Sequence, residues 1–225
     1  MRFKYIFTTV VALWGSLTAT NFEWEEPVAV SEQEKFLHSS SIDINNNGQR
    51  LAAWIEQSLG GNWNIKARFF DGKEWEDPDQ TIMDSASPFE YPVAKLNNEG
   101  EGIAVWYSQT KNQIEYATFN GVAWSDVSDV AITTAEVTQL SLSFDDNSNA
   151  LLLYTDNIND LHSKMYVGGS WSDAEVLAGD SASISLNATA ATPDGKHLAV
   201  WAEGGGKHPK KSKVSFFVPQ GCKAM

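Results

Sequence analysis

The sequence contains one cysteine, an excess of acidic over basic residues, and no segment with helical periodicity. Cys222 has no second cysteine to pair with inside the chain, so the fold must close without an internal disulfide. Sixteen Lys and Arg residues stand against 29 Asp and Glu residues, and the formal net charge is −13. A charge of that sign argues against nucleic acid or an anionic membrane as the main partner.

Long apolar runs are also missing after the first twenty residues. The start, MRFKYIFTTVVALWGSLTAT, has Arg2 and Lys4 before an apolar stretch from Tyr5 to Leu13 that is too short to span a bilayer. This order of charge and hydrophobicity predicts a signal peptide over residues 1–20, with a buried N-terminal strand as the alternative. We therefore expect a secreted or periplasmic protein without membrane insertion, and one domain over residues 21–225.

Motifs that would hold a cofactor or a metal are lacking as well. The sequence contains no phosphate-binding glycine loop, no nucleophile elbow and no Cys/His dyad, and its histidines lack metal-ligand spacing. The segment DINNNG at 43–48 begins like a calcium loop, but Trp54 stands at the twelfth position, where a bidentate acid is required. We expect no cofactor and no metal ion.

A repeat fills the rest of the chain. Four segments share an Asn/Asp/Glu-Gly or Asn-Ser step followed six residues later by an aromatic residue, and the aromatics recur at intervals of 52, 48 and 47 residues: Trp54, Trp106, Tyr154 and Trp201. Gly48, Gly100, Ser148 and Gly195 mark the turns, because Asn-Gly and Asp-Gly steps tolerate positive φ.

Strand-like runs flank each turn, and together they define a repeated unit. SSIDI, YPVAKL, LSLSF and SISLNATA precede the turns, the aromatic segments follow them, and NIKARFF, QIEYATF, LHSKMYV and KSKVSFF come third. In three units a further turn leads to Trp75, Trp124 or Trp171, which we assign to a fourth strand. A four-stranded meander of about 48 residues is typical of a β-propeller blade.

The two chain ends suggest how such a propeller closes. The fourth unit ends at SFFVPQGCKAM without a Trp strand, whereas Phe22–Pro27 matches Glu74–Pro78 around Trp24. We therefore predict an all-β fold, a β-propeller of four four-stranded blades closed by the N-terminal strand, which would remove open sheet edges. An incomplete ring that dimerises and a stack of separate meanders are the alternatives.

The repeat resembles secreted bacterial β-propeller repeat proteins of the broad sialidase-like or BNR-like group. The resemblance rests on G-x-x-x-A-V-W, the I-x-A-x-F-like strand and x-G-x-x-W-S, and it covers the mature chain. Residues 191–203, ATPDGKHLAVWAE, also resemble one PD40 unit of TolB-like propellers. A sialidase would require three arginines and Ser-x-Asp-x-Gly-x-x-Trp turns; beyond Arg2 the chain has only Arg50 and Arg68 and no such turn.

One group of polar residues could form a site. We call the four recurring aromatics, Trp54, Trp106, Tyr154 and Trp201, the column aromatics. Two residues after each of them, at the end of the second strand of its unit, stand Glu56, Ser108, Asp156 and Glu203. Residues two apart on a strand share a face, so a propeller would bring these side chains around one rim. They could bind a cation or a basic ligand or act as acids and bases, or they could be ordinary polar strand ends.

A second group consists of aromatics that the repeat does not explain. These are Trp63, in the long loop after the first aromatic strand, together with Tyr107, Tyr91 and Phe89. Exposed aromatic faces stack on sugars, although Trp63 could instead fold back as a lid on the core.

We therefore expect an exported, non-catalytic β-propeller that binds a protein or a glycan through one face. A glycosidase using the carboxylate rim and a TolB-like envelope component are the alternatives. The sequence leaves the ligand and the oligomeric state open.

Overall fold

The structure is a computed structural model of the whole chain, and it describes all residues except 1–26, 28, 32–35, 180–182, 205–210 and 218–225. Among the described residues every regular element is a β-strand, and there are 16 of them in four antiparallel sheets. No helix in this part of the chain is long and apolar enough to cross a membrane.

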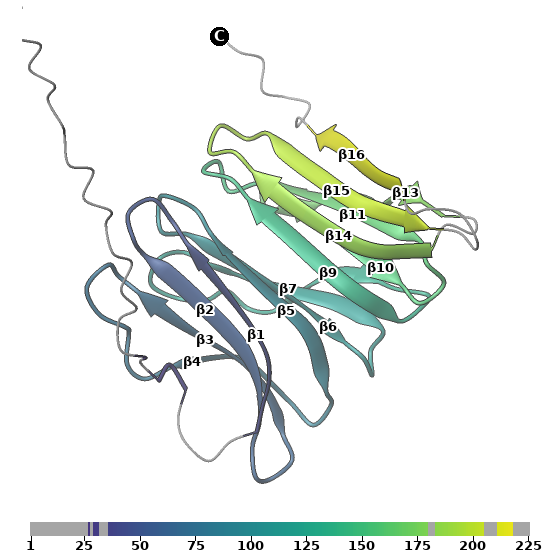
Figure 1. Cartoon of the computed structure of the whole chain (residues 1–225). Helices are drawn as coiled ribbons and strands as arrows, with labels where there is room; N and C mark the ends of the chain where they lie inside the picture. Colours follow the sequence, from purple (N-terminus) through teal and green to yellow (C-terminus); the bar gives the residue numbers. More distant parts are fainter. Residues whose placement is uncertain (1–26, 28, 32–35, 180–182, 205–210, 218–225) are drawn as a thin grey trace, which may run out of the picture.

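Each sheet is a meander in which the chain runs from strand to neighbouring strand (Figure 1), except that the last two strands of sheet 3 both pair with the strand before them. Sheet 1 contains β1 (Phe36–Ile44), β2 (Arg50–Gln57), β3 (Trp63–Phe70) and β4 (Gln80–Ser85), and sheet 2 contains β5 (Phe89–Leu96), β6 (Gly102–Ser108), β7 (Gln113–Phe119) and β8 (Ser128–Ile132). Sheet 3 contains β9 (Val137–Phe144), β10 (Ala150–Asp156), β11 (Leu161–Val167), β12 (Ser170–Trp171) and β13 (Glu175–Ala178). Sheet 4 contains β14 (Ser183–Ala191), β15 (His197–Gly204) and β16 (Lys211–Phe217).

The first three strands of every unit lie where the repeat predicted them. The four turns between first and second strands have the expected positive φ, from 58° at Ser148 to 90° at Gly195. The local hydrogen-bond pattern explains this choice, because in each turn the residue at the Gly or Ser position donates its N–H to a carbonyl three residues earlier, as Gly48 does to Asn45.

The predicted fourth strand was placed too early in the chain. Trp75 and Trp124 each form only an isolated bridge, with Phe70 and Phe119, and Trp171 lies in the two-residue strand β12. The carboxylate of Asp71 accepts hydrogen bonds from the N–H groups of Lys73 and Glu74, so the turn before Trp75 is tight, and the pairing that follows it is limited to this bridge. The outer strands β4, β8 and β13 begin further along the chain.

The sheets stack in chain order through a repeated apolar contact. The second strand of each sheet has two faces. One face carries Trp54, Trp106, Tyr154 or Trp201, and we call it the aromatic face. The opposite face carries mainly aliphatic residues, and we call it the aliphatic face. Trp106 of sheet 2 packs against Leu51, Ala53 and Ile55 of sheet 1. The same arrangement recurs when Tyr154 meets sheet 2 and Trp201 meets sheet 3. The core therefore consists of three layers between neighbouring sheets.

Polar bonds connect the sheets at the turns between first and second strands, which we call the turn end. Asn98 accepts a hydrogen bond from the N–H of Asn46 in sheet 1 and donates two to Asp146 in sheet 3, at 2.8 Å each. Asp43 of sheet 1 accepts from the N–H of Leu96 in sheet 2 at 3.0 Å. These bonds fix the stagger of neighbouring sheets.

Sheets 1 and 4 lie at opposite ends of this stack, with sheets 2 and 3 between them (Figure 1). The structure therefore has the four repeated meanders that the sequence predicted, arranged as an open arc in its described part. The strand around Trp24 that was expected to close the ring lies outside the described residues, as does Cys222. Closure within one chain stays a prediction.

Candidate functional site

The end of the sheets opposite the turn end is irregular in every unit. The pairing of first and second strands shifts register near the start of the first strand, between Leu37 and Ser40 in sheet 1 and between Glu90 and Val93 in sheet 2. Equivalent shifts occur in sheets 3 and 4. β-Bulges redirect side chains and are frequent beside functional sites. We call this end of the molecule the bulge end.

A groove of about 270 Å³ opens at the bulge end between sheets 1 and 2. We call it the bulge-end groove, and its lining is His38, Ser39, Ile55, Trp63, Pro88, Phe89, Glu90 and Tyr91. The bulges supply His38 and Ser39 from β1 and Tyr91 from β5. Two neighbouring sheets thus contribute side chains to one concave surface.

Aromatic residues form much of this groove. The rings of Trp63 and His38 lie 4.4 Å apart. Trp63 is the first residue of β3 and is half-buried against the core of sheets 1 and 2, so the prediction that it lies in a loop was wrong. Backbone pairing of Trp63 with Gln57 extends β2 and β3 to this point and shortens the loop. Phe89, by contrast, is buried beneath the groove.

Tyr91 is held in an unusual conformation. Its φ is 54°, in the left-handed region that bulky residues rarely adopt, and its side chain is 36% exposed. Strained residues of this kind cluster at ligand-binding positions, where the surrounding structure holds them in place.

Glu90 gives the groove a polar group with a shifted pKa. Gln109 donates a hydrogen bond to its carboxylate at 2.6 Å. Burial and then the negative charge of Glu136 raise the pKa of Glu90, and a hydrogen bond with Tyr91 partly opposes the rise. Burial and the charges of Glu90 and Glu136 raise the pKa of Tyr91 in turn.

The predicted rim residues lie at the bulge end, each paired with a residue near the start of a first strand. Glu56 pairs with Leu37, Ser108 with Phe89, Asp156 with Val137, and Glu203 with Ile184.

Two of these carboxylates bind their own column tryptophans. The indole N–H of Trp54 donates to Glu56 at 3.4 Å, and that of Trp201 donates to Glu203 at 2.9 Å. Glu56, Ser108 and Asp156 are buried. Tyr107 is also buried, and its hydroxyl donates to Asn112 at 2.9 Å. Glu56, Ser108, Asp156 and Glu203 therefore lie at the ends of the second strands, beside the register shifts.

One group of side chains has the composition of a metal site. Ligand atoms of Asp156, Asp160 and His162 lie within 4.8 Å of one another. Asp156 also accepts the backbone N–H groups of Ile158 and Asp160, and its second oxygen lies 3.1 Å from Nε2 of His162. The ring of Tyr154 stacks on that of His162, with 4.7 Å between the ring centres. Burial of the Tyr154 hydroxyl, and then the charge of Asp156, raise the pKa of Tyr154 to about 12.

Sequence reasoning missed Glu90, Gln109 and His38. The sequence repeat aligns the central residues of the first strands in different units. Near the start of these strands the β-bulges shift the register, so His38 and Glu90 have no aligned counterparts. The one signal in the sequence was the step Glu90-Tyr91-Pro92, where proline excludes a regular central strand.

A second concave surface lies at the turn end. Its volume is about 430 Å³, and residues of β1, β5, β9 and β14 line it. The polar groups that line it include Asp43, Lys95, Asn98 and Asp146, which already bind one another across the sheets. We therefore assign this surface to the stacking of the sheets.

No family profile and no curated protein matches the chain. Several solved structures, however, are similar to this chain in fold. The α-L-arabinofuranosidase Arb93A from Fusarium graminearum is 17% identical with a TM-score of 0.53 over 80% of this chain and 61% of its own. AofleA from Arthrobotrys oligospora is 14% identical with a TM-score of 0.56 over 83% and 59%. The leech intramolecular trans-sialidase is 15% identical with a TM-score of 0.50 over 78% and 30%.

At these identities the similarity concerns the fold alone. The chain spans about three fifths or less of each of these three structures. The similar structures include β-propeller enzymes, and the repeated meanders fit that architecture. The chain is therefore an all-β protein whose fold is similar to that of β-propeller enzymes.

Proposed function

We propose that this protein is exported and binds a glycan, without cleaving it, through the bulge-end groove. The observation that carries the proposal is the joint presence of two accessible aromatic residues, Trp63 and Tyr91, and two polar ones, His38 and Glu90, in one concave surface built by two sheets. Aromatic faces pack on the apolar faces of sugars, while a carboxylate and an imidazole bind hydroxyl groups.

The comparisons support this choice at the level of the fold. Arb93A is named as an arabinofuranosidase and the leech protein as a trans-sialidase, so propellers of this type serve proteins that act on glycans. In our proposal Glu56, Ser108 and Tyr107 belong to the second strands of the two sheets that form the groove, whereas Asp156 and Glu203 lie in sheets 3 and 4 and take no part in it.

Replacing Trp63 by alanine is expected to weaken glycan binding about tenfold or more, because a stacked indole contributes more than about 1.4 kcal/mol through buried area and ring contact. The glycan is first selected on an array with the mature chain and then titrated calorimetrically. Trp171→Ala is the matched control, since Trp171 is also a half-buried tryptophan but lies in sheet 3. Equal losses in both variants would show that Trp63 acts only through stability. An array without any signal would favour a protein partner, including a component of an envelope complex.

Binding is also expected to depend on Glu90 in a defined direction. Its pKa is raised, so the carboxylate becomes protonated at a higher pH than an ordinary glutamate. If the ionised form accepts hydrogen bonds from sugar hydroxyls, affinity falls as the pH drops through this raised pKa. Glu90→Gln should bind more weakly at neutral pH and lose this pH dependence. A pH profile of Glu90→Gln that matches the wild type would remove Glu90 from the site.

A glycosidase is the second candidate, and the interaction of Glu90 with Glu136 favours it. When two carboxyl groups repel each other, the pKa of one is raised, so that one can act as the acid and the other as the base. The array-selected glycan is incubated with the protein, and released reducing ends are measured. We expect none. Release that disappears in both Glu90→Gln and Glu136→Gln would establish hydrolysis instead.

A further inference from the structure

The charged groups at the bulge-end groove are all of one sign. In the part of the chain that the structure describes, the lining contains the carboxylate of Glu90 and no lysine or arginine. A second carboxylate, that of Glu136, acts on the same place: burial, and then the charge of Glu136, raise the pKa of Glu90. An anionic group of a ligand would therefore meet negative charge here and no cation.

The carboxylate of Glu90 is held by neutral partners. Gln109 donates a hydrogen bond to it at 2.6 Å, and it has a further hydrogen bond with Tyr91. Asp79 differs, because Lys66 pairs with its carboxylate at 3.0 Å. No ion pair of Glu90 occurs among the described residues. Removing a charge from water costs free energy that an opposite charge offsets, so the half-buried Glu90 is suited to a ligand that brings a cation.

The aromatic rings of the groove add a second preference for a cation. Trp63 and Tyr91 line the same surface as Glu90, and the faces of such rings attract positive groups. On the outer side of sheet 1 the chain supplies the cation itself, since the guanidinium carbon of Arg50 lies 4.6 Å from the centre of the Phe70 ring. The described residues supply no such cation to the rings of the groove.

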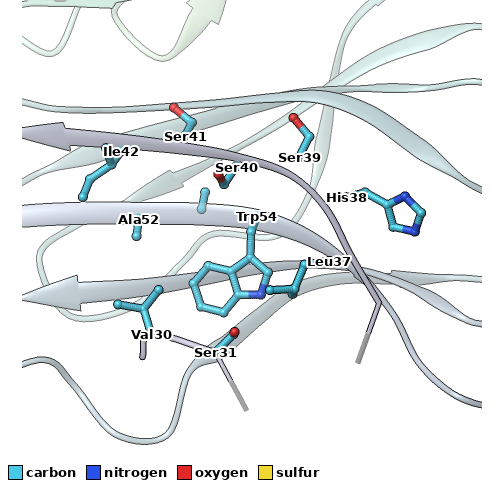
Figure 2. Close-up of a pocket in the computed structure, with 11 residues that line it drawn as sticks. Val30, Ser31, Leu37, His38, Ser39, Ser40, Ser41, Ile42, Ala52 and Trp54 are labelled. Atoms are coloured by element: carbon cyan, nitrogen blue, oxygen red, sulfur yellow. The ribbon is translucent and has the colours of Figure 1, made fainter. Parts of the chain in front are cut away.

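The neighbouring groove on the aromatic face of sheet 1 has a different character (Figure 2). Its volume is about 370 Å³, and Leu37, Ile42 and Trp54 belong to its apolar lining. The residues described there include no carboxylate, lysine or arginine. His38 borders both grooves, but in Figure 2 its ring points away from Trp54, and it lies 4.4 Å from the ring of Trp63. Selection for charge therefore falls to the bulge-end groove.

We propose that the ligand of the bulge-end groove is an amino sugar whose amino group is free and positively charged. The inference rests on the proposed function and names the class of glycan. The ammonium group pairs with Glu90, while the sugar ring packs on Trp63 and Tyr91. An N-acetylated sugar lacks the charge, and an acidic sugar places a carboxylate beside Glu90. The net charge of −13 acts in the same direction at longer range, because an acidic protein attracts cationic ligands.

Calorimetric titration of the mature chain with glucosamine and N-acetylglucosamine oligomers of equal length tests this proposal. The two probes differ only in the acetyl group, and a galacturonate oligomer serves as the acidic probe. The pH is set slightly below neutral, where the sugar amine is protonated and an ordinary carboxylate is ionised. We expect the glucosamine oligomer to bind about tenfold or more tightly than the acetylated one, and this preference to shrink as salt is added. The galacturonate oligomer should not bind.

Glu90→Gln preserves the size of the side chain and removes its charge, so this variant should bind the glucosamine and N-acetylglucosamine oligomers with similar affinity. Glu99→Gln is the matched control, because Glu99 is exposed at the turn end and its replacement changes the net charge by the same amount. The control should keep the preference of the wild type.

The outcomes separate this inference from the proposed function. Binding of the acetylated or the acidic oligomer at least as tightly as the glucosamine oligomer would overturn the inference and leave the proposed function intact. An unchanged preference in Glu90→Gln would do the same. Failure of every sugar to bind would overturn both, and binding of an oligolysine peptide in that case would identify a basic protein as the partner.

Discussion

Trp106→Ala is expected to destabilise the protein by about 3–5 kcal/mol, more than the loss of any outer tryptophan. Trp106 is fully buried at the centre of the layer between sheets 1 and 2, and its indole N–H donates to Glu115 at 3.0 Å. Alanine leaves a cavity there and removes one of the two hydrogen-bond donors to the buried carboxylate of Glu115, which keeps its ion pair with Lys111. The free energy of unfolding of an ordinary domain is about 5–15 kcal/mol, so a loss of this size is a large fraction of it. Urea unfolding monitored by fluorescence measures the change.

Trp124→Ala provides the matched control for this experiment. Trp124 is a tryptophan of the same sheet, but it is half-buried and forms only an isolated bridge with Phe119. Its removal should cost clearly less, about 1–2 kcal/mol. Equal costs for the two variants would contradict the assignment of the aromatic column, rather than the outer tryptophans, to the core of the stack.

Asp145→Ala is expected to cost about 3 kcal/mol or more, because one buried carboxylate serves both a turn and a sheet contact. One oxygen accepts the N–H groups of Asn147 and Asn149 at 2.9 Å each. The other lies 3.3 Å from Nε2 of His197 in sheet 4. Alanine leaves these donors without their acceptor, and two of them, on Asn149 and His197, belong to buried residues. Thermal and urea unfolding of the variant measure the loss.

Asp194→Ala is the control, at the equivalent turn of sheet 4. Asp194 binds Thr192 and Lys196 but is exposed, so its replacement should cost much less than that of Asp145. If Asp145→Ala were as mild, water would have to reach the donors around His197, and the turn-end contact between sheets 3 and 4 would be weaker than its geometry indicates.

Most of the scaffold could be predicted from the sequence, because each unit repeats its turn and its strands in one order. Gly48 and Trp54 have counterparts in every unit, and the structure places all of them equivalently. The outer strands were predicted less well, since Trp75 forms only an isolated bridge and the outer strand of sheet 1 begins at Gln80. Repetition identifies strands but not the point at which pairing resumes.

The candidate site could be predicted only in part, for a related reason. Trp63 and Tyr91 stood out because the repeat did not need them. Glu90 and His38 did not stand out, because the bulges that place them in the groove break the alignment between units. A bulge depends on sheet-to-sheet packing, and a single sequence carries no direct mark of that packing.

The central claim is that the two ends of the sheets have different roles, with the turn end holding the stack together and the bulge end binding the ligand. Hydrogen–deuterium exchange, measured with and without the glycan selected on the array, tests this claim most directly. We expect added protection in the peptides that contain His38, Trp63 and Glu90–Tyr91, and none in the turn peptides that contain Asn46, Asn98 and Asp146. Protection confined to the turn peptides would contradict the account.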